Sequence, residues 1–374
     1  MTKVSLFVPD LEGGGAERMM VHLANEFSLK SLAVDLVLAE SKGHNLFKVE
    51  KSVHIVDLNT PFSNPLIIFK LASYLRNVRP TALLTAMTYP NIAGLLAGKI
   101  ARVSTRIVIS ERTTLTVQSG NIKSLRECLK PAVAKRLYRF ADHIVAISDG
   151  VAENLHSNIG IRRDKITTIY NPVVTPELLQ PHSKPDHPWF ANTQSPIILA
   201  AGRFVAAKDF STLIKAFAEV KKQRDARLII LGEGPQRKIL TDLIAQLNLM
   251  DSISLPGFVQ NPACYMQHAS LFVLSSRWEG FGNVLVEALA CGCPVVSTNC
   301  PSGPEEILDS GKYGKLVLVG DPHALANAIL STLDKPPAAE ILHHRAMQFT
   351  AEKSAENYLK ILLPDSQSCR MDEM

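Results

Sequence analysis

The sequence is most informative between residues 277 and 290, which read Arg277-Trp278-Glu279-Gly280-Phe281-Gly282-Asn283-Val284-Leu285-Val286-Glu287-Ala288-Leu289-Ala290. A helical pattern starts near Gly282 and is apolar on nearly every side, so it is predicted to be buried. Glu287 is its only charge, and a buried carboxylate is costly unless a polar group pairs with it. A sugar or ribose hydroxyl would supply that partner, and the N-terminus of the same helix suits a phosphate. With Glu279 eight residues earlier, the segment predicts contacts to both halves of a nucleotide-sugar.

Short apolar strands alternate with helical patterns along both halves of the chain. In the first half, the predicted strands span residues 4–8, 34–39, 54–57, 82–86, 106–110 and 143–147. In the second half, they span residues 197–201, 228–231, 252–255, 271–274, 295–298 and 315–319. This alternation predicts an α/β protein with two Rossmann-like, doubly wound parallel-sheet domains that face each other across a cleft. Ligands of such sheets bind in the loops at the carboxyl ends of the strands.

The domain boundary is predicted from a proline-rich, irregular stretch at residues 171–194, which is interpreted as the linker. The N-terminal domain is therefore expected to span residues 1–172 and the C-terminal domain residues 173–350. A last helical pattern, at residues 351–363, is expected to pack back across the cleft on the first domain.

The composition is typical of a globular protein, with 374 residues of which 46% are hydrophobic and 20% charged. The apolar run at residues 4–9 is too short for a secretory signal, and the longest uncharged window, residues 81–98, is broken by Tyr89-Pro90-Asn91. We therefore expect a cytoplasmic protein without a membrane span. The six cysteines form no CxxC pair and are interpreted as buried, reduced thiols and not as a metal site.

Positive charge is concentrated in the first half of the chain. Residues 1–180 contain 22 Lys and Arg against 15 Asp and Glu, whereas residues 181–374 contain 18 against 20. The first half is therefore expected to meet an anionic partner. Basic residues are not interleaved with aromatic ones as in single-strand binders, so we do not expect nucleic acid. An anionic membrane surface, at the inner face of the plasma membrane, is favoured.

A basic, amphipathic stretch at residues 122–140 supports a membrane contact. Glu127 is its only acid, and its cations are Lys123, Arg126, Lys130, Lys135, Arg136 and Arg139. Apolar residues recur at spacings of three and four, at Leu125, Leu129, Val133, Leu137 and Phe140. Pro131 is expected to kink the helix or to divide it into two. Such a helix suits anionic lipid or an acceptor with a diphosphate–lipid, and a solvated helix with an inward apolar stripe is the alternative.

A glycine-rich loop follows the first predicted strand and reads Leu11-Glu12-Gly13-Gly14-Gly15-Ala16-Glu17-Arg18. Gly14 and Gly15 would let the backbone approach a ligand closely, at a helix start that suits an anion. The loop lacks the GxGxxG pattern of dinucleotide sites, and a tight turn without a ligand is the alternative.

Two cations stand in the loop after the strand at residues 197–201, which reads Gly202-Arg203-Phe204-Val205-Ala206-Ala207-Lys208-Asp209. Arg203 and Lys208 suit a diphosphate, because Arg grips two oxygens and Lys is a compact point charge. They would stabilise the negative charge that develops on a nucleoside diphosphate leaving group, without a metal. Two solvated surface cations are the alternative.

Two further loops end the next predicted strands. Gly232-Glu233-Gly234-Pro235 is interpreted as a plain turn. Phe258 and Val259, in the loop that begins with Pro256-Gly257, would line a nucleobase with backbone groups and an apolar edge, and a plain turn is again the alternative.

Together, Arg203, Lys208 and the Glu279–Glu287 pair, in this order and spacing, resemble family 4 of the retaining glycosyltransferases, which have the GT-B fold. The loop Gly13-Gly14-Gly15-Ala16-Glu17-Arg18 resembles the first loop of the bacterial polysaccharide-assembly members. Ala146-Ile147-Ser148 with Ile169-Tyr170-Asn171-Pro172-Val173 resembles the run into the interdomain linker, and residues 349–363 resemble the final helix.

The resemblance implies transfer of a hexose or N-acetylhexosamine, with retention of anomeric configuration, in cell-envelope polysaccharide synthesis. The donor would be a nucleotide-sugar, with UDP preferred over GDP, and the acceptor a lipid-linked or lipid-core saccharide. The N-terminal domain would bind the acceptor and the C-terminal domain the nucleotide-sugar. No cofactor and no metal are implied, and the departing phosphate would help to remove the acceptor proton in a front-face displacement.

The resemblance also implies roles for individual residues. Arg203 and Lys208 would hold the donor diphosphate, Glu279 would meet a hydroxyl of the transferred sugar, and Glu287 would bind the ribose. Backbone amides would line the phosphate and the sugar, at Phe281, Gly282 and Asn283.

One departure from the family pattern concerns the end of the strand at residues 106–110. Many relatives place a His there, near the transferred sugar, whereas this chain reads Val108-Ile109-Ser110-Glu111-Arg112-Thr113-Thr114. The Ser-Glu-Arg pattern resembles the subgroup that extends lipid-linked or lipid-core saccharides. Ser110, Glu111 or Arg112 would then contact the acceptor or the sugar, and a salt-bridged strand end is the alternative for the latter two.

Three other classes of protein share parts of this pattern. A sugar-nucleotide epimerase of the same fold would need acid and base groups around C2 of the sugar, and no convincing carboxylate–His set is present. A nicotinamide-dependent oxidoreductase is disfavoured by the absent fingerprint. A non-catalytic sugar-nucleotide-binding protein is disfavoured by the intact set Arg203, Lys208, Glu279 and Glu287.

Overall fold

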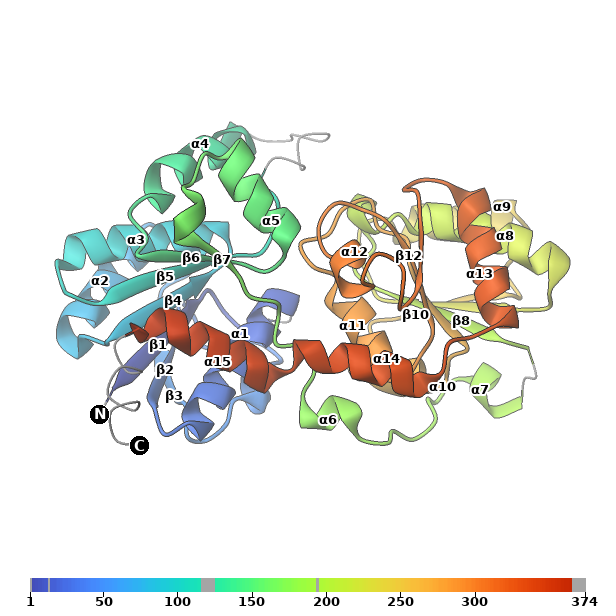
Figure 1. Cartoon of the computed structure of the whole chain (residues 1–374), viewed down its shortest axis with the longest axis horizontal. Helices are drawn as coiled ribbons and strands as arrows, with labels where there is room; N and C mark the ends of the chain where they lie inside the picture. Colours follow the sequence, from blue (N-terminus) through green and yellow to red (C-terminus); the bar gives the residue numbers. More distant parts are fainter. Residues whose placement is uncertain (1, 13, 116–124, 193–194, 365–374) are drawn as a thin grey trace. The chain divides into compact units, whose positions relative to one another are not determined.

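The chain forms two compact units in the computed structural model, which describes residues 2–12, 14–115, 125–192 and 195–364, without the side chains of residues 125–130 and 192. Unit 1 comprises Met1–Pro172 with Thr350–Met374, and unit 2 comprises Val173–Phe349. Figure 1 shows a sheet with helices on its faces in each of them. Within the described residues, no helix is both long enough and apolar enough to span a bilayer.

Unit 1 is built on a parallel sheet of seven strands in the order β3-β2-β1-β4-β5-β6-β7. The strands are β1 (Lys3–Val8), β2 (Ala33–Leu38), β3 (His54–Asp57), β4 (Ala82–Ala86), β5 (Arg106–Glu111), β6 (His143–Ala146) and β7 (Ile166–Thr168). Its helices are α1 (Gly15–Leu29), α2 (Leu66–Val78), α3 (Thr88–Ala101), α4 (Leu125–Tyr138), α5 (Asp149–Glu153) and α15 (Ala351–Leu362). Strands β1, β4 and β5 are almost wholly buried, which explains their near-continuous apolar sequences.

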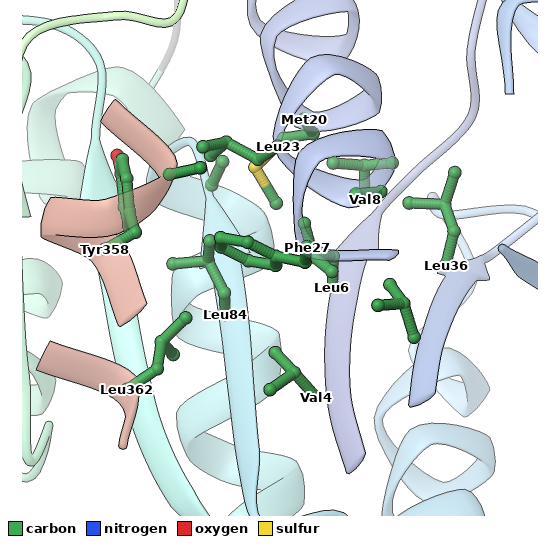
Figure 2. Close-up of a cluster of buried hydrophobic side chains, with 14 of the residues drawn as sticks. Val4, Leu6, Val8, Met20, Leu23, Phe27, Leu36, Leu84, Tyr358 and Leu362 are labelled. Atoms are coloured by element: carbon green, nitrogen blue, oxygen red, sulfur yellow. The ribbon is translucent and has the colours of Figure 1, made fainter. Parts of the chain in front are cut away.

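The C-terminal helix α15 belongs to the core of unit 1. Its buried residues recur at helical spacing, at Ala351, Ser354, Ala355, Tyr358 and Leu362. Figure 2 shows Tyr358 and Leu362 beside the strand residue Leu84, in one apolar cluster with Leu6 and Phe27. Each fully buried Leu-sized side chain contributes about 1.5–3 kcal/mol to the stability of the fold. The buried face of this helix is therefore a substantial part of the core of unit 1.

Unit 2 repeats the plan with six parallel strands in the order β10-β9-β8-β11-β12-β13. The strands are β8 (Ile197–Ala201), β9 (Arg227–Leu231), β10 (Ile253–Gly257), β11 (Leu271–Leu274), β12 (Val295–Thr298) and β13 (Lys315–Val317). Its helices are α6 (Pro176–Leu179), α7 (Pro188–Asn192), α8 (Phe210–Gln223), α9 (Arg237–Gln246), α10 (Pro262–His268), α11 (Asn283–Ala290), α12 (Pro304–Ile307), α13 (Pro322–Asp334) and α14 (Ala339–Ala346).

Short helical turns complete the two units. They are η1 (Leu46–Lys48), η3 (Asn154–Asn158), η4 (Arg163–Lys165), η5 (Ala206–Lys208) and η6 (Met347–Phe349).

Each sheet has one point at which the strand order reverses direction. In unit 1 this point lies between the neighbouring strands β1 and β4, and in unit 2 it lies between β8 and β11. The loops after these strands run to opposite faces of the sheet and leave a crevice, where open α/β sheets bind their ligands. The strand order therefore directs attention to the loops after β1, β4, β8 and β11.

Some local features differ from the prediction. Residues 171–194 contain the short helices α6 and α7, and β7 was not predicted. Helix α4 is continuous from Leu125 to Tyr138 with Pro131 inside it, so of the two predicted effects of Pro131, a kink or a division, the division is wrong. Proline fits inside a helix where neighbouring groups satisfy the freed carbonyl or where that carbonyl meets water.

Candidate active site

The loops that leave β8 and β11 carry three of the predicted site residues. Arg203 is exposed directly after the turn at Gly202, and Lys208 ends the short helix η5. Glu279 lies in the loop after β11, the strand next to β8 in the sheet. The switch point of unit 2 thus brings together residues that are more than 70 positions apart in the sequence.

An ion pair joins two of these residues. Lys208 Nζ lies 2.5 Å from Glu279 Oε1, and the two side chains are only 19% and 12% exposed. Ser276 Oγ donates to the same carboxylate oxygen at 2.6 Å. Because the pair is largely shielded from water, its charges act on a bound ligand more strongly than surface charges would.

A second group of polar residues fixes the two loops to each other. Arg277 Nε donates to Asp209 Oδ2 at 2.9 Å, and the Arg277 backbone N–H donates to Ala207 O at 2.7 Å. Ser275 Oγ donates to Lys208 O at 2.8 Å, and this hydrogen bond holds the backbone of Lys208 in place. Asp209 adopts a left-handed conformation with φ 44° and accepts from Thr212, so the turn after Lys208 is also fixed.

Sequence reasoning missed these supporting residues. Asp209 stands beside Lys208, and Ser276 and Arg277 stand within three residues of Glu279. Adjacency to the predicted site was therefore the available signal. The contact between Asp209 and Arg277, however, joins the β8 and β11 loops, and that pairing follows only from the order of the strands in the sheet.

Helix α11 begins as predicted, with Gly282 as its N-cap residue at φ 100°. The predicted burial of this helix is confirmed, because residues 285–290 are all buried. Glu287 is 4% exposed, and it stands on the helix that starts next to the Lys208–Glu279 pair. The Phe281 side chain is buried and packs on Phe349 with ring centroids 5.5 Å apart. A ligand could therefore contact Phe281 only through its backbone.

Gly303 packs directly against the backbone of the turn that precedes α11. A Cβ atom at this position would lie 1.8 Å from the carbonyl oxygen of Phe281, and Gly303 has φ 100°. A larger residue would therefore push against the backbone that presents the N-terminus of α11.

Replacing Gly303 by Ala is expected to lower the free energy of unfolding by about 2–4 kcal/mol, since the positive φ and the clash both penalise a Cβ. Gly320→Ala is the matched control, because Gly320 also has a positive φ of 77° but nothing lies within 4 Å of its added Cβ. That variant should lose only about 1 kcal/mol. Urea unfolding measures both, and equal losses would mean that the contact with Phe281 does not matter.

Two other loops lie at the carboxyl edge of the second sheet. An added Cβ at Gly232 would lie 2.0 Å from Gly202 O. Glycine at this position therefore allows the loop after β9 to pack closely against the loop that carries Arg203. Phe258 follows the edge strand β10 and is 73% exposed, and Val259 is half-buried. Their position is open to a ligand, and the nucleobase contact stays a prediction.

The thiols of unit 2 are free at Cys264, Cys291, Cys293 and Cys300, while the side chains of Cys128 and Cys369 lie outside the described part. Burial, and next the Glu287 carboxylate, raises the pKa of Cys291 to about 12. Glu287 thus stands close to a thiol that stays protonated. Among the described residues, no group of three His, Cys, Asp or Glu side chains is placed to hold a metal ion.

In unit 1, the glycine-rich loop leads from β1 into α1. Gly13 lies outside the described residues, and Gly14 is the N-cap of α1 in an extended conformation with φ −74°. A Cβ at Gly14 would lie 1.9 Å from Glu17 Oε2, so a larger residue would have to displace the Glu17 side chain, and the backbone here needs no special φ. Gly15 is exposed at the start of the helix.

Glu111 ends β5 and is fully buried among protein donors. Thr88 Oγ1 lies 3.1 Å from both of its carboxylate oxygens, Tyr138 Oη donates to Oε2 at 2.5 Å, and the Arg112 backbone N–H donates to Oε1 at 3.0 Å. Burial, and then the Glu111 charge, raises the pKa of Tyr138 well above its usual value, so Tyr138 stays a donor. Thr88 is the first residue of α3 and follows β4. Its hydrogen bonds therefore connect Glu111 to the switch point of unit 1.

Helix α4 exposes part of its apolar surface. Val133 is 39% and Phe140, just beyond the helix, is 43% exposed, whereas Ala134 and Tyr138 are buried. The alternative prediction, in which the apolar side chains of this stretch point inward, is therefore wrong for Val133 and Phe140. Lys99 Nζ lies 3.1 Å from the Phe140 ring centroid. Lys123 and the side chains of Arg126 and Lys130 lie outside the described part, and the membrane contact stays a prediction.

Comparisons with known proteins identify the family. Residues 13–176 match the family model described as Glycosyltransferase Family 4, and residues 185–349 match the model described as Glycosyl transferases group 1. The chain is 32% identical over 377 residues to an N-acetylgalactosamine-N,N'-diacetylbacillosaminyl-diphospho-undecaprenol 4-alpha-N-acetylgalactosaminyltransferase of Campylobacter jejuni, with 97% of this chain and 100% of the relative covered.

Two further similarities extend along nearly the whole chain. The lipopolysaccharide core biosynthesis glycosyltransferase LpsE of Rhizobium meliloti is 28% identical over 365 residues, which cover 93% of this chain and 96% of that protein. The crystal structure of HepE from Anabaena in complex with UDP superposes with a TM-score of 0.74 at 22% identity, and covers 97% of this chain and 99% of that one.

The protein therefore belongs to the family 4 and group 1 glycosyltransferases. The predicted fold class is confirmed, since both units are doubly wound parallel sheets and the neighbouring structures are glycosyltransferases of the GT-B type.

Proposed function

We propose that the protein transfers a hexose or N-acetylhexosamine from a UDP-sugar to a lipid-linked or lipid-core saccharide in bacterial envelope polysaccharide synthesis, with retention of anomeric configuration. The observation that carries the proposal is the shielded Lys208–Glu279 pair at the switch point of unit 2, next to the helix that carries buried Glu287. A nucleotide-sugar offers a diphosphate and two sets of hydroxyls, and these three residues offer a cation and two carboxylates to match.

The donor would bind to unit 2 along the edge formed by the β8, β10 and β11 loops. Exposed Arg203 and half-buried Lys208 would hold the diphosphate, and backbone amides at residues 281–283 would add the N-terminal end of the α11 dipole. Glu279 would accept from a hydroxyl of the transferred sugar and Glu287 from the ribose. Phe258 and Val259 would line the base.

Unit 1 would bind the acceptor, and its backbone at Gly14 and Gly15 would contact a phosphate. Support for a lipid-linked acceptor comes from the name of the Campylobacter jejuni relative, which transfers to a diphospho-undecaprenol saccharide, and from LpsE, which acts in lipopolysaccharide core synthesis. Support for UDP comes from the HepE crystal structures in complex with UDP and UDP-glucose.

The proposed reaction breaks the bond between the sugar anomeric carbon and the diphosphate oxygen. The acceptor hydroxyl attacks the same face of that carbon, and its proton passes to the departing diphosphate oxygen. Lys208 and Arg203 stabilise the negative charge that grows on the diphosphate as the bond breaks. Glu279 keeps Lys208 in place through their ion pair, so the cation is oriented before the reaction begins.

Thermal unfolding in the presence of UDP, GDP, ADP and NAD tests the donor assignment. A ligand at a hundredfold its dissociation constant adds about 2.7 kcal/mol of stability, which raises the midpoint by several degrees for a domain of this size. We expect the largest shift with UDP. A shift with GDP alone would keep the donor site but change the base, whereas a shift with NAD alone or with none of the four would contradict the proposed function.

A further inference from the structure

Arg112 is a buried cation whose hydrogen-bonding capacity is only partly used. It follows β5, the second strand from the switch point of unit 1, and is 6% exposed. Its Nη1 group donates to Asn171 Oδ1. Within the described part of the chain, no atom accepts a hydrogen bond from its Nε or Nη2 groups, although both are buried.

The unused groups form one edge of the guanidinium. Nε–H and one Nη2–H point in parallel, and this edge grips two oxygens of a carboxylate or phosphate at once. Leaving such donors buried without an acceptor is unfavourable, and more so for a charged group. A residue with a purely structural role would be expected to use this edge within the protein.

The nearest carboxylates do not use this edge. Glu111 accepts from Thr88, Tyr138 and the Arg112 backbone. Glu17, in the first turn of α1, folds back so that Oε2 would lie 1.9 Å from a Cβ at Gly14. Burial lowers the pKa of Arg112, and the charges of Tyr358, Glu17 and Glu111 act in the opposite direction. Arg112 therefore remains a cation with acidic groups near it but none on its free edge.

A second feature that attracts anions lies close by. Helix α1 is 15 residues long, starts at Gly15 and has no side-chain cap, because its N-cap residue is Gly14. Its N-terminal dipole favours a negative ligand. The charge of Glu17, in the first turn of α1, raises the pKa of Arg112. β1 and β5 are separated only by β4, which is about 10 Å across two strand spacings.

We propose that the free Nε and Nη2 edge of Arg112 binds a phosphate oxyanion of the substrate in unit 1, beside the N-terminus of α1. The identity of the substrate rests on the proposed function, in which both the sugar donor and the lipid-linked acceptor carry a diphosphate. Glu111 then has a positioning role: it holds the Arg112 backbone, and Asn171 fixes the opposite edge of the guanidinium.

Titration calorimetry with four variants tests the proposal. Arg112→Gln removes the charge, Arg112→Lys keeps the charge without the two-donor edge, Asn171→Ala releases the guanidinium, and Arg102→Gln is the control because Arg102 is an exposed arginine of the same unit. The probes are inorganic pyrophosphate, UDP and geranyl diphosphate, with geranyl alcohol as the uncharged match. Unfolding midpoints are measured for every variant.

We expect Arg112→Gln to weaken at least one diphosphate probe by about 10- to 100-fold, and Arg112→Lys to weaken it by a smaller factor, while Arg102→Gln binds like the wild type. The unfolding midpoint of Arg112→Gln should not fall, because the substitution removes a buried, partly unpaired cation. Weaker UDP binding alone assigns Arg112 to the donor, and weaker geranyl diphosphate binding alone assigns it to the acceptor.

Wild-type affinities of Arg112→Lys for all three diphosphate probes would overturn the proposal, as would an equal loss for geranyl alcohol. If Arg112→Gln fails to fold, the Lys and Asn171→Ala variants still decide the question, because both keep the charge. A wild-type protein that binds no nucleotide would count against the proposed function, whereas a loss of pyrophosphate affinity in Arg112→Gln relative to Arg102→Gln reports on Arg112.

Discussion

Replacing Glu279 by Gln is expected to lower kcat by about 10²- to 10³-fold, while the dissociation constant for UDP changes by less than about threefold. Gln keeps the shape of the side chain but removes the negative charge that pairs with Lys208 at 2.5 Å. Lys208 would then be free to change its rotamer, and the hydroxyl of the transferred sugar would lose its charged acceptor. The loss of that acceptor acts on the reacting sugar, which bare UDP does not contain, and Arg203 would still hold the diphosphate of UDP.

Steady-state kinetics with a sugar donor, together with calorimetry on UDP, separates the two effects. Glu340→Gln is the matched control, because Glu340 is an exposed carboxylate on α14 of the same unit. Ser276→Ala removes the second donor to Glu279 and should lower kcat by a smaller factor. A Glu279→Gln enzyme with wild-type kcat would show that the ion pair has no part in the reaction.

Replacing Glu287 by Gln is expected to weaken UDP binding by about 10- to 100-fold with an intact fold. A carboxylate that accepts from ribose hydroxyls forms charge-assisted hydrogen bonds, and each such bond contributes about 1.5–3 kcal/mol. Because Glu287 is 4% exposed, water would compensate little of that loss. Gln has nearly the same volume, so the packing of α11 should survive.

Calorimetry and the UDP-dependent rise of the unfolding midpoint measure this effect, again with Glu340→Gln as the control. The Glu287→Gln variant should unfold cooperatively without ligand and respond weakly to UDP. If its UDP affinity matched that of the wild type, Glu287 would be a structural carboxylate of a buried helix, and the ribose would have to bind elsewhere.

Much of the fold followed from local patterns in the sequence. The apolar runs at residues 82–86, 197–201 and 271–274 match β4, β8 and β11 to the residue, because buried parallel strands leave near-continuous apolar segments. β7 was missed because it is only three residues long, Ile166-Thr167-Thr168, and carries one buried side chain. Its assignment as a strand depends on pairing with β6, which a local pattern cannot show.

The candidate site was predictable where its signal was local. The Glu279–Glu287 spacing, the Gly282 turn and the apolar helix lie within one short segment, and the structure places them as a loop and a buried helix. The contacts that join the two loops were not predictable, because Arg277 pairs with Asp209 and Ser275 donates to Lys208 O between loops from different strands. The unused edge of Arg112 is also a tertiary property, since it depends on which neighbours fail to accept from it.

The place of α15 also bears on how the newly made chain folds. Ala355, Tyr358 and Leu362 share an apolar core with strands β1 and β4, although they are the last part of that core to be synthesised (Figure 2). At about 5–20 residues per second, a ribosome needs on the order of 10–40 s to make the intervening segment Val173–Phe349. The first sheet must wait that long with part of its apolar face uncovered, while the second unit is continuous in sequence and can close as soon as it emerges. Nascent chains should therefore depend on chaperones for the unit that is made first.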